Sequence, residues 1–281
     1  MRMRKKPNLI PRMERCSRYL VDDPAEWRGR WREKLAPGCA LRLELGCGKG
    51  RFTCETAAAE PDVLFVAVER VPDAMIIAME RAQAAGLRNV FFIDADVAKL
   101  REYFAPGEVE RIYLNFSDPW PANRHAKRRL THPGFLEIYR DVLQDGGEIH
   151  FKTDNKGLFE WSLFQFPKAD YALTEVTRDL HRDGVQGVMT DYEEKFHAQG
   201  VKIHRCVAVK LHREPGGGRG APAPRLRQGD GNRAKKRSGP CKRHRSGSFF
   251  SARQPHASAT TRYIRKKWVM LPSRMNTWKI S

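Results

Sequence analysis

Short apolar segments alternate with segments of helical periodicity from about residue 36 to residue 212. The segments typical of strands are residues 41–45, 64–68, 90–93, 111–115, 148–152, 171–176 and 202–209. Segments with helical spacing or helix-terminating residues lie between them, at 52–59, 72–86, 134–143 and 157–165. Strands separated by helices form right-handed βαβ units, which give a mostly parallel sheet. We therefore predict an α/β fold with a doubly wound, mostly parallel seven-stranded sheet, which the last two strands close as an antiparallel pair.

Three regions of the chain differ in composition. Residues 1–35 form a basic and aromatic N-terminal arm, residues 36–212 carry the strand and helix pattern, and residues 213–281 form a basic tail. The tail holds 18 Lys and Arg against 2 Asp and Glu, which accounts for +16 of the net charge of +19 and leaves +3 for the rest. Its composition cannot bury enough apolar surface to fold, so we predict disorder. It is either an electrostatic tether for RNA or an aberrant end produced by a frameshift or read-through.

The cysteines, histidines and apolar runs indicate the cellular compartment. None of the six cysteines forms a CxxC pair, which is typical of free thiols in a reducing environment. The nine histidines show no metal-ligand spacing, so we predict no metal. The basic N-terminus is followed by no apolar signal segment, and no apolar run is long enough to span a bilayer. We predict a soluble cytoplasmic protein that does not bind membranes, and either a monomer or a homodimer.

Acidic residues stand at or just after the ends of successive predicted strands: Glu44, Glu69, Asp96, Asp118 and Asp154. In an open parallel sheet, ligands bind beyond the carboxyl ends of the strands. Carboxylates that lie close together at one edge repel one another, so a purely structural role does not explain why five of them occur there. We expect these five side chains to line a binding site.

The segment 44–50 reads Glu-Leu-Gly-Cys-Gly-Lys-Gly, and its glycines are Gly46, Gly48 and Gly50. A dehydrogenase would instead carry the GxGxxG spacing that binds a dinucleotide pyrophosphate. An acid ahead of the glycines suits a ligand with an ammonium group and no phosphate, which describes S-adenosylmethionine. Glu69 ends the next strand, where a carboxylate accepts hydrogen bonds from ribose hydroxyls. Asp96, after the third strand, is placed to contact the adenine amine.

Four further segments are more specific: 116–121 (Phe-Ser-Asp-Pro-Trp-Pro), 124–130 (Arg-His-Ala-Lys-Arg-Arg-Leu), 151–155 (Phe-Lys-Thr-Asp-Asn) and 189–196 (Met-Thr-Asp-Tyr-Glu-Glu-Lys-Phe). In this order they resemble the motifs of the bacterial tRNA (guanine-N7-)-methyltransferase family. The resemblance covers about residues 1–212. It implies the Rossmann-like class I methyltransferase fold, S-adenosylmethionine as methyl donor, and transfer to N7 of a guanine in the variable loop of tRNA.

The resemblance also implies roles for individual residues. The methyl donor would contact the glycine-rich loop and four acids, namely Glu44, Glu69, Asp96 and Asp118, of which Asp118 is the catalytic residue. The guanine pocket would be lined by Asp118, Asp154, Thr190, Asp191, Tyr192 and Glu193. The RNA backbone would contact Arg124, His125, Lys127, Arg128 and Arg129. The family usually has a lysine on the substrate side at position 122, where this chain has Ala122.

The expected chemistry places few demands on the protein. N7 of guanine has a free lone pair and no proton, so methyl transfer needs no strong base and depends mainly on alignment of the reacting atoms. Asp118 or Asp154 would accept hydrogen bonds from N1–H and the exocyclic amine, and adenine lacks that pair of donors. Trp120 is either a stacking wall for the base or a packing residue.

Two alternative functions stay open at this point. An adenine-N6 methyltransferase shares the fold but carries two prolines before the aromatic residue of its motif, where segment 117–121 has one. A non-catalytic RNA-binding relative would fit Ala122 and the unusual tail, but not the complete series of carboxylates.

Overall fold

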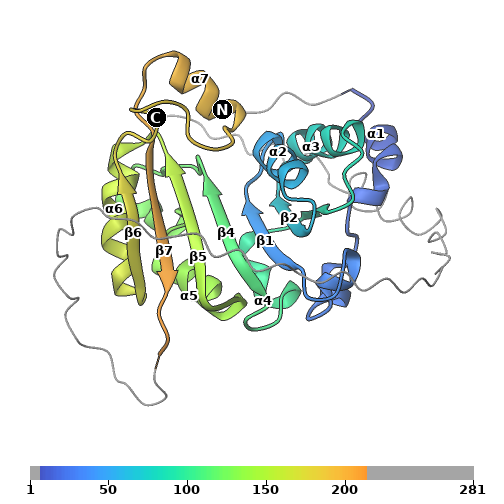
Figure 1. Ribbon diagram of the computed structural model, residues 1–281, viewed down its shortest axis with the longest axis horizontal. Coiled ribbons are helices and arrows are strands. Elements are labelled where there is room, and N and C mark those ends of the chain that lie inside the picture. Colours follow the sequence, from blue (N-terminus) through green and yellow to red (C-terminus); the bar gives the residue numbers. More distant parts are fainter. Residues whose placement is uncertain (1–6, 214–281) are drawn as a thin grey trace, which may run out of the picture.

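Figure 1 shows the computed structural model, which describes residues 7–213 of the chain. One sheet contains seven strands in the order β3-β2-β1-β4-β5-β7-β6. The strands are β1 Ala40–Leu45, β2 Val63–Glu69, β3 Val90–Asp94, β4 Val109–Asn115, β5 Leu143–Thr153, β6 Tyr171–Thr177 and β7 His204–Lys210. The first five are parallel, and β7 runs antiparallel to both β5 and β6. The predicted α/β fold with its closing antiparallel pair is confirmed.

Helices connect the strands on both faces of this sheet. The α-helices are α1 Leu9–Arg15, α2 Arg51–Ala59, α3 Pro72–Ala84, α4 Leu100–Tyr103, α5 Pro133–Val142, α6 Lys156–Lys168 and α7 Asp191–Ala198. The short 3-10 helices are η1 Ser17–Tyr19, η2 Pro24–Trp27, η3 Trp31–Lys34, η4 Val97–Lys99 and η5 Asn123–Arg128. Local sequence sets where they start: the Asn155 side chain accepts the amide hydrogen of Leu158 at 2.8 Å, which caps α6 directly after β5.

The buried strands supply two cores, one on each face of the sheet. Along β2, Leu64, Val66 and Val68 enter the core that α4, α5 and α6 cover. Phe65 and Ala67 enter the other core, which α1, α2 and α3 cover. Because successive side chains of a strand point to opposite faces, a strand that is apolar at every position has to be buried on both. This explains the uninterrupted apolar run of β2.

The described part of the predicted N-terminal arm packs against the sheet. Trp31 is fully buried, and its indole nitrogen donates to the carbonyl of Tyr103 at 2.8 Å. Tyr19 is also buried, in the core on the opposite face. Between them, Leu20 forms a parallel bridge with Phe92 of β3. The segment therefore protects the edge strand β3 from pairing with another chain.

Residues 1–6 of the predicted arm and residues 214–281 of the predicted tail lie outside the described residues, so the predicted disorder of the tail stays a prediction. Arg213, the first residue of the predicted tail, forms ion pairs with Glu137 (2.9 Å) and Asp170 (2.6 Å). Its side chain is thus bound to the domain. Among the described helices, none combines the length and apolarity needed to cross a bilayer.

Candidate active site

The sheet register brings the ends of the predicted site strands together. Glu69 at the end of β2 is the register partner of Asp94 in β3, and Asn115 at the end of β4 is the partner of Lys152 in β5. In Figure 1, β4 and β5 end toward α7, which lies across this edge of the sheet. The loops after β1, β2, β4 and β5 therefore meet at one edge.

The glycine-rich loop binds directly to Glu69. The amide of Gly48 donates to Oε2 of Glu69 at 2.8 Å, so these two predicted donor-binding elements are in contact. Gly46, Gly48 and Gly50 have φ values of 80°, 56° and 72°, which non-glycine residues rarely adopt. A Cβ at Gly46 or Gly48 would meet nothing within 4 Å, whereas one at Gly50 would lie 2.3 Å from Cβ of Ala78. The loop thus leaves open space for a ligand on one side and packs tightly against α3 on the other.

Glu69 and Asp96 are both partly exposed at this edge of the sheet. The other oxygen of Glu69 accepts the amides of Arg70 and Val71, both at 2.8 Å. Asp96 accepts the amide of Ala98 at 2.9 Å and pairs with Arg70 at 3.1 Å. Both carboxylates retain acceptor capacity, so they fit the hydroxyl and amine donors of S-adenosylmethionine.

Glu44 lies deeper than the other acids. Its side chain is buried, and its oxygens accept hydrogen bonds from the hydroxyl of Thr53 and from the amide nitrogen of Asn115, the latter at 3.0 Å. Burial raises the pKa of Glu44 above its ordinary value. The carboxylate therefore joins β1, α2 and β4 within the protein, and its contact with the donor stays a prediction.

The loop after β4 is strained and presents Asp118 to solvent. Phe116 and Trp120 flank it with φ values of 52° and 42°, in the left-handed region. Asp118 is exposed, and within residues 7–213 its side chain makes no hydrogen bond or ion pair. Oγ of Ser117 and Oδ1 of Asn115 are buried without a hydrogen-bond partner among the described residues. The loop thus offers polar groups that a bound ligand can satisfy.

Segment 124–129 is only partly exposed. Arg124, Lys127 and Arg128 face solvent, as the predicted RNA contact requires. Arg129 is 6% exposed, and its guanidinium donates to backbone carbonyls of the preceding loop. The prediction that Arg129 contacts the RNA backbone is therefore wrong, because its guanidinium points into the protein.

Trp120 is half-buried and has its own packing partners. The ring meets His125 edge to face at 5.8 Å, and the guanidinium of Arg128 lies 4.8 Å from its centre. These contacts favour the packing role over a free stacking wall for the base.

The segment at the start of α7 combines capping with ion pairs. Thr190 and Glu193 form a capping box, in which the Thr190 hydroxyl accepts the amide of Glu193 at 3.0 Å and a Glu193 oxygen accepts the amide of Thr190 at 3.2 Å. Asp191 pairs with Arg81 of α3 at 2.8 Å. Tyr192 is 53% exposed and is the member of this segment most open to solvent. Substrate contacts of these four residues remain predictions.

Comparison with known sequences identifies the family. The sequence model of a family described as "Putative methyltransferase" matches residues 40–206. The tRNA (guanine-N(7)-)-methyltransferase of Geobacillus kaustophilus is 45% identical over 211 residues, which is 75% of this chain and 97% of that protein. The enzyme of the same name from Streptococcus suis is 43% identical, over 74% of this chain and 99% of that protein. The chain belongs to the tRNA (guanine-N(7)-)-methyltransferase family. It is an S-adenosylmethionine-dependent methyltransferase.

Solved structures of other methyltransferases share the fold of this family member. The 16S rRNA methyltransferase KamB superposes with a TM-score of 0.53 at 16% identity, covering 66% of this chain and 94% of that one. The 16S rRNA (adenine(1408)-N(1))-methyltransferase from Catenulisporales acidiphilia gives 0.51 at 14% identity, over 68% and 95%. At such identities the likeness concerns the Rossmann-like fold alone.

The sequence motifs gave no role to three side chains of this methyltransferase that bind predicted site residues: Asn115, Lys152 and Arg81. Lys152 donates to Glu193 at 2.7 Å, and Arg81 binds Asp191. The sequence does contain one relevant signal: Thr190-x-x-Glu193 has the spacing of a capping box and predicts that a helix starts there. This spacing does not show that Lys152 forms an ion pair with Glu193.

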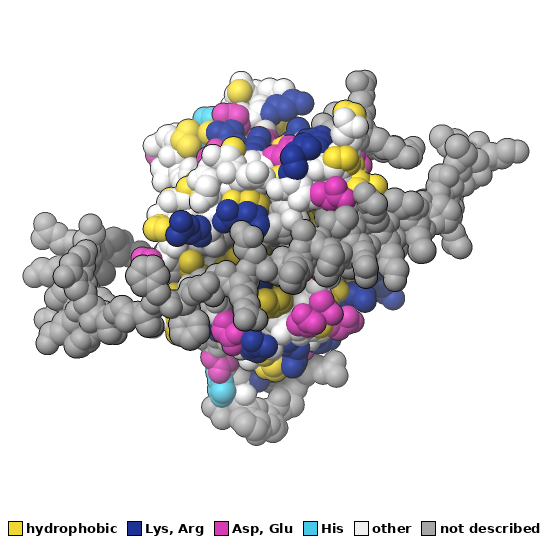
Figure 2. All heavy atoms as spheres, turned by 90° about the vertical axis from the view of Figure 1, so that its right-hand side faces the viewer, with side chains coloured by type: hydrophobic (Ala, Val, Ile, Leu, Met, Phe, Trp, Pro, Cys, Tyr) yellow, Lys and Arg dark blue, Asp and Glu magenta, His cyan; other side chains and the backbone are white. Residues whose placement is uncertain are grey.

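The charge of the methyltransferase domain is mixed. Figure 2 shows the end formed by α1 and α3, where Lys and Arg lie among Asp and Glu. One such pair joins Arg12 of α1 to Glu80 of α3 at 2.6 Å. On the visible part of this face the two signs of charge thus alternate, and the predicted RNA contact rests on the exposed cations of segment 124–128.

Proposed function

We propose that this chain transfers a methyl group from S-adenosylmethionine to N7 of a guanine in the variable loop of tRNA. The observation that carries the proposal is the contact between the glycine loop and Glu69, at the same sheet edge where exposed Asp118 follows β4 and half-buried Asp154 follows β5. The names of the family members in Geobacillus kaustophilus and Streptococcus suis support the reaction and the tRNA substrate.

Glu69, Asp96 and the glycine loop would hold the methyl donor. Glu69 lies at the end of β2 and Asp96 two residues beyond β3, so both residues lie at the sheet edge that carries Gly46 and Gly48. S-adenosylmethionine supplies an electrophilic methyl group on its sulfonium sulfur. The protein's part is to fix the orientation of that group toward the base.

Asp118 and Asp154 would select guanine. Asp118 is exposed and Asp154 is half-buried, on loops that follow the neighbouring strands β4 and β5. A carboxylate there accepts hydrogen bonds from N1–H and the exocyclic amine of guanine. Adenine offers no such pair of donors, and each polar group left unpaired costs about 1–3 kcal/mol. Since N7 carries no proton, neither carboxylate has to act as a strong base.

The exposed cations of segment 124–128 would bind the RNA backbone next to this pocket. Arg124, Lys127 and Arg128 follow the Asp118 loop directly and face solvent. Phosphate contacts of this kind fix the register of the RNA without reading its sequence. A base in a structured loop has to leave its stack to reach the pocket.

The test is to incubate the protein with labelled S-adenosylmethionine and unmodified tRNA, then map the methyl group by chemistry that cleaves at 7-methylguanosine. We expect a single cleavage in the variable loop. Label on adenine would instead support the adenine-N6 alternative. Binding of the donor without any transfer would support the non-catalytic relative.

Variants at two acids sharpen this test. Asp118→Asn should reduce turnover by roughly 100-fold or more, as expected when a positioned group in the transition state is lost. Asp183→Asn is the control, because Asp183 is exposed and pairs only with its neighbour Arg182 at 3.0 Å among the described residues. Near-normal turnover of Asp118→Asn would remove Asp118 from the mechanism.

A further inference from the structure

Arg129 binds the loop that carries Asp118 through three successive carbonyl groups. Its Nε donates to the carbonyls of Pro119 (3.1 Å) and Trp120 (3.2 Å), and its Nη2 donates to those of Trp120 (2.9 Å) and Pro121 (3.4 Å). The planar guanidinium presents several donors in a fixed fork, which a lysine ammonium cannot reproduce. One side chain thus donates hydrogen bonds to the carbonyls of three consecutive residues in this loop.

The same guanidinium contacts the helix that follows the loop of Asp154. Its central carbon lies 4.5 Å from the ring centre of Trp161 in α6. That helix begins directly after Asp154, and the Asn155 side chain caps it. Stacking of a guanidinium on an indole is favourable and is stronger away from water. Arg129 therefore links the loop after β4 to the helix that follows β5.

The Asp118 loop depends on such support. Phe116 and Trp120, on either side of Asp118, both have positive φ values. Strained backbone of this kind persists only where surrounding contacts fix it. Because the Asp118 side chain has no partner of its own within residues 7–213, its position depends on the backbone that Arg129 holds.

We propose that Arg129 is a positioning residue, which holds the loop 117–121 so that Asp118 keeps its position relative to Asp154. The proposal rests on the proposed function and replaces an RNA contact by a role inside the protein. Arg129 is 6% exposed, whereas Arg124 of the same basic segment is exposed. The two residues have the same side chain, but only that of Arg124 is exposed enough to reach a phosphate. Variants at the two positions can therefore be compared directly.

The test compares Arg129→Lys with Arg124→Ala in kcat, in KM for tRNA and in the salt dependence of tRNA affinity. Arg129→Lys should lower kcat on the order of 100-fold at saturating tRNA, because the reacting groups lose alignment. Its logarithmic salt slope should match that of the wild type. Arg124→Ala should act mainly on KM and should reduce the salt slope by about 1. A reduced slope with retained kcat in Arg129→Lys would overturn the proposal.

A second variant covers the case in which Arg129→Lys does not fold. Trp161→Leu removes the ring beneath the guanidinium and changes no charge. The amide of Phe116, which donates to the carbonyl of Lys152 at 2.9 Å directly before the loop 117–121, should exchange its hydrogen faster in this variant, while exchange in β2 stays slow. Unchanged exchange at Phe116 would count against Arg129. A wild-type protein that fails to methylate tRNA would contradict the proposed function instead. The two failures can be distinguished, because hydrogen exchange is measured without any methyl transfer.

Discussion

Nζ of Lys152 lies 2.7 Å from Oε2 of Glu193, and this ion pair joins the end of β5 to the first turn of α7. Glu193 is fully buried, and its other oxygen lies 3.0 Å from Nε2 of His181. A second, more exposed pair between Arg81 and Asp191 ties the same turn to α3. The α7 helix is therefore held across the site edge by a buried pair and by more exposed pairs, among them Arg51 with Glu194.

Removing one partner of the buried pair should be costly. We expect Lys152→Met to lower the free energy of unfolding by about 3–5 kcal/mol, because the buried carboxylate of Glu193 loses its lysine partner and keeps only His181 beside it. Adding Glu193→Gln should recover part of that loss. Urea denaturation measures both, with Arg182→Met as the control, since Arg182 is 74% exposed and a surface pair contributes about 1 kcal/mol or less. An equal, small effect of Lys152→Met and Arg182→Met would contradict the importance of the pair.

Gly50 should tolerate a side chain less well than Gly46. Both have positive φ, so alanine at either position costs roughly 1–2 kcal/mol in backbone strain. Only at Gly50 does the new Cβ collide with Ala78, which adds about 1–3 kcal/mol of overpacking. Thermal unfolding of the two variants measures the difference. Ala78→Gly in the Gly50→Ala background should restore part of the stability, and the lack of any rescue would show that the collision is not the cause.

The sequence predicted the strands well because their apolar runs have one physical cause. A segment such as Leu64–Val68 is apolar at every position only if both of its faces are buried, and β2 is Val63–Glu69. The direction of a charged side chain has no such periodic signal. Arg129 stands in a basic segment typical of a solvated surface, yet it turns inward because the carbonyls of Pro119–Pro121 need donors. Spacing likewise does not show that Glu193 is fully buried beside Lys152, and its substrate contact stays a prediction.

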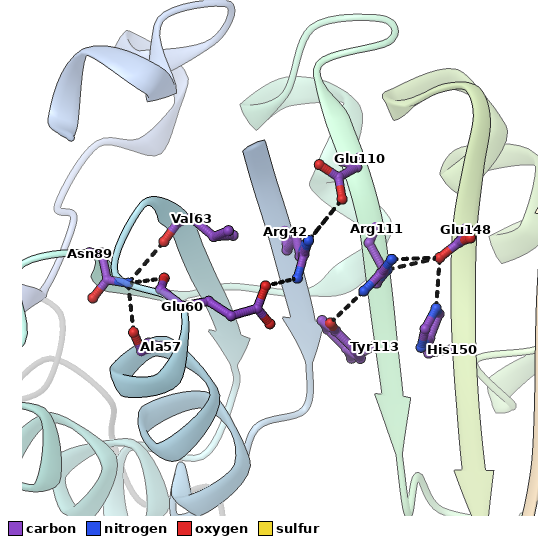
Figure 3. A network of polar contacts seen from close by, with 10 residues as sticks. All are labelled: Arg42, Ala57, Glu60, Val63, Asn89, Glu110, Arg111, Tyr113, Glu148 and His150. Atoms are coloured by element: carbon purple, nitrogen blue, oxygen red, sulfur yellow. Dashed lines mark hydrogen bonds and ion pairs between the residues drawn. The ribbon is translucent and has the colours of Figure 1, made fainter. Parts of the chain in front are cut away.

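His150 should make the protein less stable in mild acid. It lies in the polar network across β4 and β5 that Figure 3 shows, with Nε2 at 2.8 Å from Glu148 and with Arg111 and Tyr113 close by. Burial lowers the pKa of His150 from 6.5 to about 4. The unfolded chain therefore takes up a proton as the pH falls below about 6.5, while the folded chain does not until about pH 4. Stability is lost across this window, on the order of 1–2 kcal/mol by pH 5.

His150→Gln should remove that part of the pH dependence. The measurement is the difference in unfolding free energy between pH 7 and pH 5, which should be smaller than in the wild type. His132 and His204 also have a pKa lowered by burial, so some loss in acid should persist. Exposed His212→Gln is the control. An unchanged difference in His150→Gln would show that another group causes the acid sensitivity.

Ala122→Lys should tighten the binding of tRNA. Ala122 is exposed, at φ −70°, so a lysine fits there without backbone strain. A new phosphate contact should steepen the logarithmic salt dependence of affinity by about 1. Filter binding at several salt concentrations measures this, and Ala122→Gln controls for side-chain length without charge. Equal affinities of the two variants would mean that no phosphate lies within reach of position 122.

The insertion of β7 between β5 and β6 has a consequence for biosynthesis. Among the described strands, β6 pairs only with β7, and β7 is the last of them to be translated. Until residues 204–210 leave the ribosome, β5 and β6 each keep an open hydrogen-bonding edge, and unpaired edges promote aggregation. A nascent chain that stalls before Lys210 therefore lacks β7, which lies inside the sheet between β5 and β6, rather than a strand at its edge. It should need chaperone protection more than a chain interrupted after that point.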